Sequence, residues 1–249
     1  MKLLSKGISN KKIAKSEKQG EYLNSILHLS PALTGGFQTC PKSTNGCRES
    51  CLFTSGYAGI FPKVNEARIR KTKLYFENRN EFYRLLISDI ESLVRKGKRE
   101  NKKVVIRLNG TSDLQFENDK IFNLKYNSFG DKNIFELFPD VQFYDYTKIF
   151  KRLEKVLPVN YYLTFSRSEN NLEECIKALK LGFNVAVVFS GKVLPLSFTI
   201  FNIDHLETYP VLSGENNDLR FLEGKQGAII GLIAKGKARK DNTGFVIDI

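Results

Sequence analysis

Apolar residues in the second half of the chain come in short unbroken runs rich in β-branched and aromatic side chains. The clearest runs lie at residues 104–108, 141–146, 161–165, 184–189 and 228–233, and weaker ones lie at 209–212 and 245–249. Such runs predict β-strands. Because they do not alternate with polar residues, they predict strands buried on both faces, as in a parallel sheet covered by helices.

Helical periodicity separates several of these runs. Within residues 80–99 apolar side chains recur every three or four positions, which predicts an amphipathic helix. Shorter helices are predicted at 146–156 and at 172–181, the second ending at Gly182. Residues 190–207 show no clear helix. The repetition of strand and helix predicts an α/β fold, and we expect an irregular or partial (βα) barrel of mainly parallel strands.

The 249 residues contain no repeat or linker that would divide them, so a single domain, 1–249, is expected. Its parts are a basic arm at 1–30, a cysteine-containing loop at 31–62, and a helix followed by the βα barrel at 63–249. No apolar run reaches the roughly 18 residues of a membrane-spanning helix. The basic N-terminal segment also lacks the apolar core of a signal peptide. We therefore expect a cytoplasmic protein without membrane contact.

The charge of the chain favours an acidic partner. The sequence has 39 Lys and Arg against 27 Asp and Glu, a formal net charge of +12. An excess of this kind favours nucleic acid or a small anionic ligand as the partner. The alternative is that the lysines serve only solubility.

The strongest local signal is a group of three cysteines. Cys40, Cys47 and Cys51 have the spacing C-x6-C-x3-C in a segment with Gly, Ser, Thr and Pro, which is typical of an ordered loop. Cytoplasmic thiols stay reduced, so a metal site is expected before a disulfide. Three cysteines from one loop suit a [4Fe–4S] cluster whose fourth iron is open or has a ligand other than cysteine. The alternative is three unrelated thiols.

Zinc is the second choice of metal. A zinc site would need a fourth ligand, for which Cys175, His28 and His205 are the candidates. Cys175 lies alone in the helical pattern at 172–181, where a small core residue is the expected role. His28 lies in an apolar stretch and is expected to be a partly buried histidine with satisfied hydrogen bonds.

Polar and charged side chains follow three of the predicted strands, in the segments 107–113, 144–148 and 163–169. The carboxyl ends of parallel strands meet on one rim, where α/β proteins bind ligands. Helix caps would explain one Ser or Asp in each loop, but not the Arg and Lys beside them. The candidate catalytic residues are Asp113, Tyr144, Asp145, Lys148 and Glu169, and the candidate ligand-binding residues are Arg107, Asn109, Ser112 and Arg167.

Two segments near the C-terminus each add a candidate ligand-binding residue. Arg220 follows a Gly-Glu-Asn-Asn turn, and Lys235 follows the predicted strand at 228–233. Both carry the charge to bind phosphate or carboxylate at the same rim. A solvated turn is an equal alternative for the lysine-rich segment.

Several of these segments together resemble one known family. The similarity lies in the cysteine segment at 40–52, Arg-Leu-Asn-Gly-Thr-Ser-Asp at 107–113, Tyr-Asp-Tyr-Thr-Lys at 144–148, Leu-Thr-Phe-Ser-Arg-Ser-Glu at 163–169, Val-Ala-Val-Val-Phe at 185–189, Asp-Leu-Arg-Phe at 218–221 and Gly-Leu-Ile-Ala-Lys-Gly-Lys-Ala at 231–238. In this order they resemble the bacteriophage gene product eighty-eight family. The resemblance covers the chain from about Leu29 onward. It implies a phage or mobile-element protein of the host cytoplasm and implies no particular reaction.

A cysteine loop ahead of a (βα) barrel is also similar to the arrangement in radical S-adenosylmethionine enzymes. That resemblance implies a cluster with one iron open to S-adenosylmethionine. The spacing differs, because those enzymes have C-x3-C-x2-C and this chain has C-x6-C-x3-C. The resemblance therefore supports iron–sulfur binding more strongly than radical chemistry.

Two functions follow as expectations, and the sequence leaves open whether the chain is an enzyme. The first is a phage-type iron–sulfur protein, either radical S-adenosylmethionine-like or another redox enzyme, acting on an anionic substrate. The alternative is a nucleic-acid-binding phage protein in which the zinc or cluster is structural.

Overall fold

The computed structural model describes residues 1–6, 20–54, 60–123, 128–129, 132–202 and 205–249. The chain forms two compact units. Unit 1 comprises Met1–Pro41, Lys63–Asp145 and Val156–Tyr162, and unit 2 comprises Lys42–Pro62, Tyr146–Lys155 and Leu163–Ile249.

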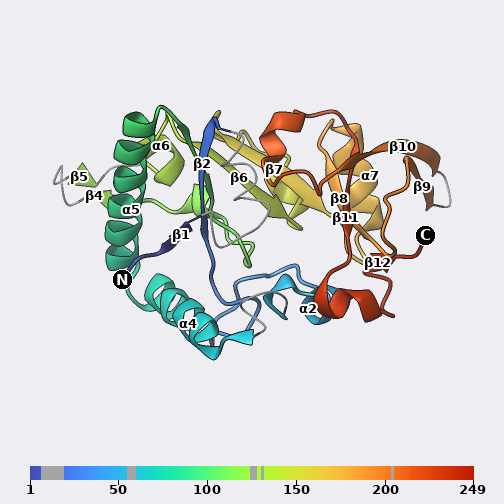
Figure 1. The fold of residues 1–249 in the computed structure, drawn as a ribbon, viewed down its shortest axis with the longest axis horizontal. Helices are drawn as coiled ribbons and strands as arrows, with labels where there is room; N and C mark the ends of the chain where they lie inside the picture. Colours follow the sequence, from blue (N-terminus) through green and yellow to red (C-terminus); the bar gives the residue numbers. More distant parts are fainter. Residues whose placement is uncertain (7–19, 55–59, 124–127, 130–131, 203–204) are drawn as a thin grey trace. The chain divides into compact units, whose positions relative to one another are not determined.

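The strands form a mixed, mostly parallel sheet (Figure 1). Their bounds are β1 Leu4–Lys6, β2 Tyr22–Leu27, β3 Lys103–Arg107, β6 Gln142–Thr147, β7 Tyr161–Ser166, β8 Val185–Phe189, β9 Ser197–Asn202, β10 His205–Ser213, β11 Ile229–Ile233 and β12 Val246–Ile247. The hydrogen-bonded order is β1-β2-β3-β6-β7-β8-β11-β10-β9, with β12 paired to β8. The pairs β2–β3, β3–β6, β7–β8, β8–β11 and β10–β11 are parallel, whereas β1–β2 and β9–β10 are antiparallel.

Three of the described helices are longer than the rest. These are α4 (Pro62–Glu77), α5 (Arg79–Glu100) and α7 (Leu172–Lys180). The short helices and 3-10 turns are α2 Asn45–Glu49, η2 Leu52–Thr54, η3 Phe116–Asn118, α6 Ile134–Leu137, η4 Phe150–Arg152, η5 Arg220–Glu223 and η6 Gly236–Lys240. Strands β4 (Phe122–Asn123) and β5 (Ser128–Phe129) form a separate two-stranded sheet.

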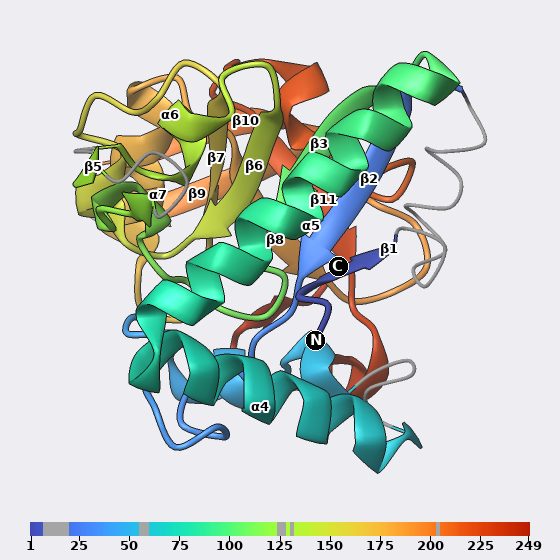
Figure 2. The ribbon, with the colours of Figure 1, turned by 90° about the vertical axis from the view of Figure 1, so that its left-hand side faces the viewer.

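Helix α5 provides much of the apolar core of unit 1. It lies along β2 and β3 (Figure 2), and Phe82, Leu86 and Ile90 are completely buried at the spacing that the sequence predicts. The helix begins after Asn78, whose side chain accepts the N–H of Glu81 at 3.1 Å. It ends at Asn101, a left-handed residue with φ of 51°.

A partly buried polar clamp joins α4 and α5 to the segment after β3. The Asp119 carboxylate accepts the hydroxyls of Tyr75 at 2.7 Å and Tyr83 at 2.5 Å. Arg79 donates to the same carboxylate at 2.8 Å. Burial and the neighbouring carboxylate raise the pKa of both tyrosines, so each stays protonated as a donor.

Unit 2 is built around the neighbouring strands β8 and β11. Val185, Val187, Ile229 and Ile230 are almost completely buried. Asn184 closes the base of this strand pair, because its Oδ1 accepts the N–H of Ala228 at 3.2 Å and its Nδ2 donates to the Gly224 carbonyl at 2.8 Å. The apolar runs at 184–189 and 228–233 therefore form central strands, as predicted.

The sequence predictions of secondary structure hold for most elements. Every predicted strand is present, and the helices at 80–99 and 172–181 match α5 and α7. The helix predicted at 146–156 is wrong: Tyr146 and Thr147 continue β6, and only the 3-10 turn η4 follows. Aromatic and β-branched residues at the start of that segment favour the strand.

The basic arm predicted at 1–30 is also wrong in part. β1 and β2 belong to the sheet, and Leu3, Leu23, Ile26 and Leu27 are buried. Polar residues at Asn24 and Ser25 interrupt the apolar pattern of β2, but both are buried too. Residues 7–19, which hold much of the predicted arm, lie outside the described part of the chain.

The α/β fold with a mostly parallel sheet is confirmed, but the (βα) barrel is not. The strand order runs from β1 to β9 without returning, so the sheet is open. Both terminal strands pair antiparallel with their neighbours. The long hairpin β9–β10 occupies 197–213, where the sequence shows no helix to continue the strand–helix repeat.

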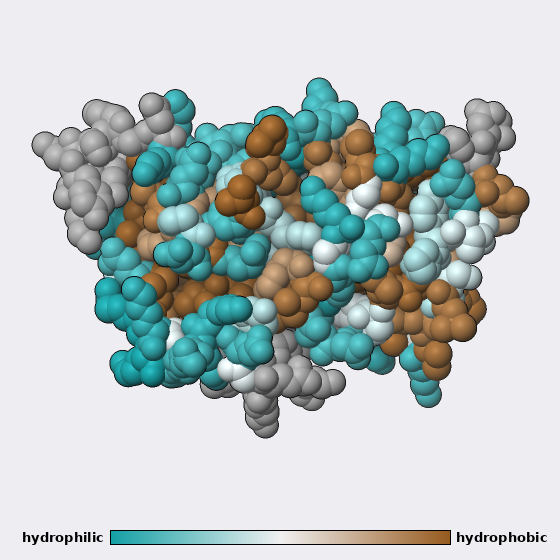
Figure 3. Space-filling model, turned by 90° about the horizontal axis from the view of Figure 1, so that it is seen from above, coloured by the Kyte–Doolittle hydropathy of each residue, from teal (hydrophilic) through white to brown (hydrophobic). Residues whose placement is uncertain are grey.

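The part of the chain that the structure describes contains no membrane-spanning helix. None of its helices is both long enough and apolar enough to cross a bilayer. On the face drawn in Figure 3, hydrophobic residues lie in small patches among hydrophilic ones.

We expect the Asp119→Ala variant to lower the free energy of unfolding by about 2 kcal/mol, because two buried hydroxyls and a guanidinium lose their shared acceptor. Urea denaturation measures this change. The matched control is Asp140→Ala, an exposed aspartate, for which we expect a change within about 0.5 kcal/mol. Equal stability of the two variants would contradict the role of the clamp.

Candidate functional site

The loop after β3 in unit 1 is fixed by a buried carboxylate at the end of β6. Asp145 is completely buried and accepts the backbone N–H of Asn109 at 2.7 Å, the Asn109 side-chain amide at 3.1 Å and the Tyr161 hydroxyl at 2.9 Å. Asn109 Oδ1 in turn accepts the Ser112 hydroxyl and the Leu114 N–H, each at 2.8 Å. The structure thus brings together Asn109, Ser112 and Asp145, and they shape the loop.

Two other candidates of unit 1 are also buried. Tyr144 is completely buried, and its hydroxyl accepts the Asn24 amide at 3.0 Å. Asp113 is 8% exposed, and its backbone N–H donates to the Thr39 carbonyl at 2.8 Å. Thr39 directly precedes Cys40, so this bond ties the loop after β3 to the first cysteine. The catalytic roles assigned to these residues stay predictions.

Cys40 lies half-buried beside the same loop. Its Sγ accepts the N–H of Ala32 at 3.4 Å and lies 3.7 Å from the Thr111 carbonyl oxygen. Ala32 is left-handed, with φ of 47°, a conformation that residues other than glycine rarely adopt. The Thr111 hydroxyl also donates to the Leu29 carbonyl at 2.5 Å, which fixes the loop against the end of β2.

The second cysteine is held in unit 2 by a carboxylate that follows β7. Cys47 lies in α2, whose N-cap Thr44 accepts the Cys47 N–H at 3.2 Å. Glu169 accepts the Thr44 hydroxyl at 2.7 Å and the Gly46 N–H at 2.8 Å. A Cβ at Gly46 would lie 2.1 Å from Thr243 Oγ1, so only glycine fits against the C-terminal segment.

The electrostatics of Glu169 follow from these bonds. Burial alone would raise the pKa of its carboxyl, but the hydrogen bonds from Thr44 and Gly46 outweigh it and hold the pKa below its ordinary value. Glu169 therefore stays ionised near neutral pH and acts as the anchor of α2.

A second carboxylate anchors the other end of α2. The C-cap residue Ser50, which precedes Cys51, donates its hydroxyl to Asp241 at 3.1 Å. Asp241 also accepts the Thr243 hydroxyl at 2.8 Å and the Val246 N–H at 3.0 Å. Sequence reasoning missed Asp241 and Thr44, and the one available signal was the Asp-x-Thr pattern of a turn at 241–243.

The basic candidates of unit 2 contact their own unit. Lys148 donates to the Ser166 hydroxyl at 2.9 Å and lies 5.6 Å from the centre of the Phe245 ring. Arg167 donates to the carbonyls of Gly244 and Phe245, each at 2.9 Å. Burial lowers the pKa of its guanidinium below the ordinary arginine value. The structure thus brings Lys148, Arg167 and Glu169 together at the end of β7.

Arg220 and Lys235 each pair with a carboxylate elsewhere in unit 2. Arg220 is completely buried and forms an ion pair with Glu223 at 2.8 Å. Burial raises the pKa of Glu223 to about 7, against the opposing effect of Arg220. Lys235 pairs with Glu215 at 2.6 Å. These contacts are structural, and ligand binding by either residue stays a prediction.

Cys175 and His28 are poor candidates for the fourth zinc ligand. Cys175 is buried in α7, as the sequence predicts, and burial raises the pKa of its thiol to about 12. Burial and nearby cations lower the pKa of His28 to about 3, so a dication there would meet a positive field. The side chain of His205 lies outside the described part of the molecule.

No disulfide joins the four cysteines, all of which are described. Among the described side chains, no group of three or more His, Cys, Asp or Glu is arranged to hold a metal ion. Cys40 belongs to unit 1, whereas Cys47 and Cys51 belong to unit 2. The environment of Cys40 is therefore that of unit 1, and the environment of Cys47 and Cys51 is that of unit 2.

The fold and these loops define an α/β protein with an open, mostly parallel sheet and polar clusters where its strands end. A family model described as Gene product 88 matches residues 2–249, so the chain belongs to the Gene product 88 family. No curated protein and no solved structure matches it. The family confirms the bacteriophage resemblance, and no comparison shows a likeness to radical S-adenosylmethionine enzymes.

We expect Glu169→Ala to loosen α2 and to raise the rate at which iodoacetamide alkylates Cys47 several-fold. Peptide mass spectrometry measures this rate. Acid should also loosen α2, and hydrogen exchange of the α2 amides measures this, because alkylation itself slows when the thiol is protonated. A lowered pKa means that the anchor is stabilising above the ordinary glutamate value of about 4.3 and is lost as the pH falls below it.

The control for this experiment is Glu173→Ala, an exposed glutamate in the first turn of α7. We expect it to leave the labelling rate of Cys47 unchanged. Equal rates for Glu169→Ala and the unaltered protein would show that Glu169 does not hold α2 in place.

Proposed function

We propose that Cys40, Cys47 and Cys51 together bind one [4Fe–4S] cluster and that the protein is an iron–sulfur protein. The observation that carries the proposal is the environment of Cys40. Its sulfur accepts a backbone N–H from Ala32, which adopts a costly left-handed conformation. Backbone N–H donors to sulfur stabilise thiolates and tune iron–sulfur clusters.

The other two thiols add support from their local structure. α2 carries Cys47 and is anchored at both ends, by Glu169 before that cysteine and by Asp241 at Ser50, next to Cys51. All three thiols are half-buried, as ligands that need both protection and access would be. Twelve residues span the whole set, so ligands from one segment can close around a metal as it binds.

The choice of a cluster over zinc follows from the fourth ligand. Structural zinc requires four ligands, and the described alternatives, His28 and Cys175, are disfavoured by charge and burial. A cluster with three protein thiolates requires none. When bound, it would supply an iron with an open position for a cosubstrate, and S-adenosylmethionine is the candidate that the resemblance implies.

The chain's own residues have supporting roles in this proposal. Asp145 and Asn109 fix the loop that contacts Cys40, whereas Lys148 and Arg167 place positive charge at the end of β7. Positive charge there suits an anionic substrate. An enzymatic redox reaction and a place in the host cytoplasm belong to the same proposal.

Metal analysis after anaerobic purification tests the proposal. We expect about four iron and four acid-labile sulfide per chain, with the visible absorbance of thiolate-bound iron. Cys40→Ala, Cys47→Ala and Cys51→Ala should each lose most of the iron. The matched control is Cys175→Ser, which keeps a donor to Asn171 and should keep the iron.

Three outcomes would overturn the assignment. Iron loss in Cys175→Ser would favour a four-cysteine site, and stoichiometric zinc without iron would favour the second metal. If the protein holds neither iron nor zinc after reconstitution with iron and sulfide, the metal proposal is refuted.

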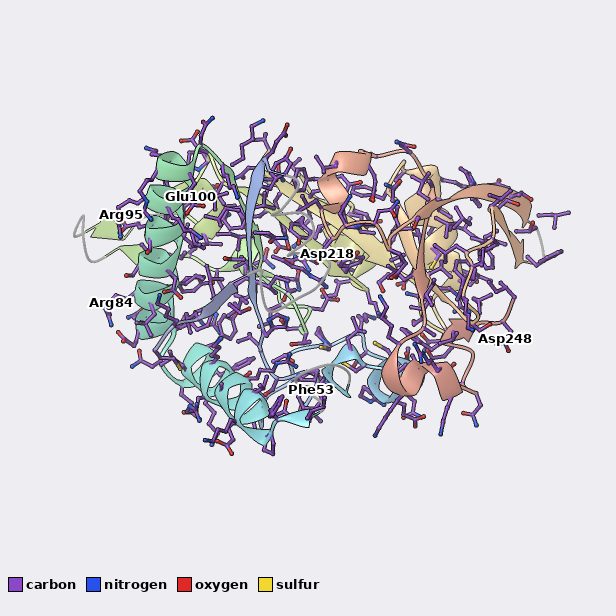
Figure 4. All side chains as sticks on the ribbon, viewed as in Figure 1. Phe53, Arg84, Arg95, Glu100, Asp218 and Asp248 are labelled. Carbon is purple, nitrogen blue, oxygen red and sulfur yellow. The ribbon has the colours of Figure 1, made fainter. Side chains whose placement is uncertain are left out.

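Nucleic-acid binding is the alternative, and the helix surface of unit 1 argues against it. On α5, Arg84 pairs with Glu81 at 2.6 Å and Arg95 faces Glu91 at 3.8 Å, and both arginines lie on the outer side of the helix (Figure 4). Cations neutralised by neighbouring carboxylates attract phosphates weakly.

We therefore expect duplex DNA to bind weakly, with little change in affinity as salt increases. A filter-binding or anisotropy titration over a salt series measures this. A log–log slope of several units would show that several phosphates are neutralised and would favour the alternative.

A further inference from the structure

Basic side chains converge where β2 and β3 end in unit 1. His28 follows β2 directly, and Arg107 ends β3 in register with Ile26. The loop after β3 closes on this point, because the Gly110 N–H donates to the Leu27 carbonyl at 3.0 Å. A Cβ at Gly110 would lie 2.8 Å from the His28 ring, so the loop packs tightly against the imidazole.

Helix α4 brings two more cations to this point. Thr72 accepts the Ser30 N–H at 2.8 Å, which fixes α4 two residues beyond His28. Its hydroxyl donates to the carbonyl of Arg68, one turn earlier on the same face, at 3.0 Å. Lys71 donates to the Leu3 carbonyl at 2.6 Å. We name Arg68, Lys71, Arg107 and His28 the basic cluster.

The members of the basic cluster are half-buried. The Nη1 atom of Arg68 and the Nε atom of Arg107 have no contact with solvent. Both arginines have interactions within the protein, and the distinctive feature of the cluster is that the charges of Arg68, Lys71 and Arg107 all act on one imidazole. Asp89 compensates Lys71 in part, and it also accepts the N–H of Leu3 at 2.7 Å.

The field at the imidazole is positive. After burial, the charges that lower the pKa of His28 to about 3 are those of Arg68, Arg107 and Lys71, and the described residues contribute no opposing carboxylate. Burial lowers the pKa of Lys71 to about 8; Asp89 opposes this change and Arg68 adds to it. An anion bound here would relieve the field at both groups.

Hydrogen bonding also assigns the His28 tautomer. Ser5 donates its one hydroxyl proton to the Ile26 carbonyl at 2.8 Å, so toward His28 Nδ1, 3.3 Å away, it must accept. Nδ1 therefore carries the proton, and Nε2 is left as an acceptor. The basic cluster thus offers three cations together with one neutral acceptor.

We propose that the basic cluster binds a phosphate group of a small molecule. Arginine and lysine donate to the anionic oxygens, and Nε2 of His28 accepts from the hydroxyl of a monoprotonated phosphate. A nucleic-acid backbone is the other source of phosphate, but it requires exposed cations rather than half-buried ones. This site goes beyond the proposed iron–sulfur function and does not depend on it.

Calorimetry with inorganic pyrophosphate and the full chain tests the site. We expect Arg68→Gln to weaken pyrophosphate binding about tenfold or more, because a charged donor is removed. The matched control is Arg70→Gln, on the same helix but exposed and facing Glu66 at 3.9 Å, with an expected change below about twofold. No binding by the unaltered protein, or equal effects of the two variants, would overturn the proposal.

A second measurement needs no variant and covers the case in which Arg68→Gln fails to fold. The chain has two histidines, so NMR can follow the His28 ring signals directly. Pyrophosphate should raise the His28 pKa by about one unit or more, since an added anion favours the imidazolium. An unchanged pKa at saturating pyrophosphate would place the anion elsewhere and refute the site.

Two further arms separate the proposals. A single-stranded oligonucleotide that competes with pyrophosphate in a strongly salt-dependent way would overturn the small-molecule source. Cys40→Ala should lose iron and keep pyrophosphate binding. Loss of pyrophosphate binding in Cys40→Ala would overturn the independence of the basic cluster. Unaltered protein that contains no iron and still binds pyrophosphate would refute only the iron–sulfur function.

Discussion

The candidate site of unit 1 depends on the hydrogen bonds that the Asp145 carboxylate accepts. This carboxylate is completely buried and receives hydrogen bonds from Asn109 and Tyr161, so it joins the end of β6 to β7 and to the loop after β3. A buried carboxylate is tolerated only when its oxygens are satisfied, which restricts the loop to one shape. That shape sets the position of Thr111 and, through it, the surroundings of Cys40.

Carboxylates distant in sequence organise the cysteine segment in the same manner. α2 is five residues long, too short to be stable alone, and Glu169 and Asp241 bind its two ends. Both carboxylates keep a lowered pKa despite burial, because hydrogen bonds to the ionised form outweigh desolvation. The segment with two of the three cysteines is thus held by unit 2 and not by its own propensity.

The sequence predicted what depends on local pattern and failed where long-range contacts decide. Apolar runs identified the central strands, and helical spacing identified α5 and α7. β2 was missed because Asn24, a polar residue, is buried against Tyr144, a contact that no local pattern encodes. Glu169 was found as a charged residue after a strand, but its partner Gly46 was not predictable. Arg68 and Lys71 could not be predicted as site residues, because no local pattern distinguishes them from the many other basic residues.

The two glycines that approach these loops closely have a consequence for the interpretation of sequence variation. Gly46 and Gly110 contribute no chemical group, yet a methyl group at either would collide with a neighbour, Thr243 in the first case and Ile26 in the second. Natural variants and saturation mutagenesis should therefore show both positions to be nearly invariant. Invariance at these positions would reflect the close approach of two chain segments. A search for functional residues that relied on sequence conservation alone would wrongly include both glycines.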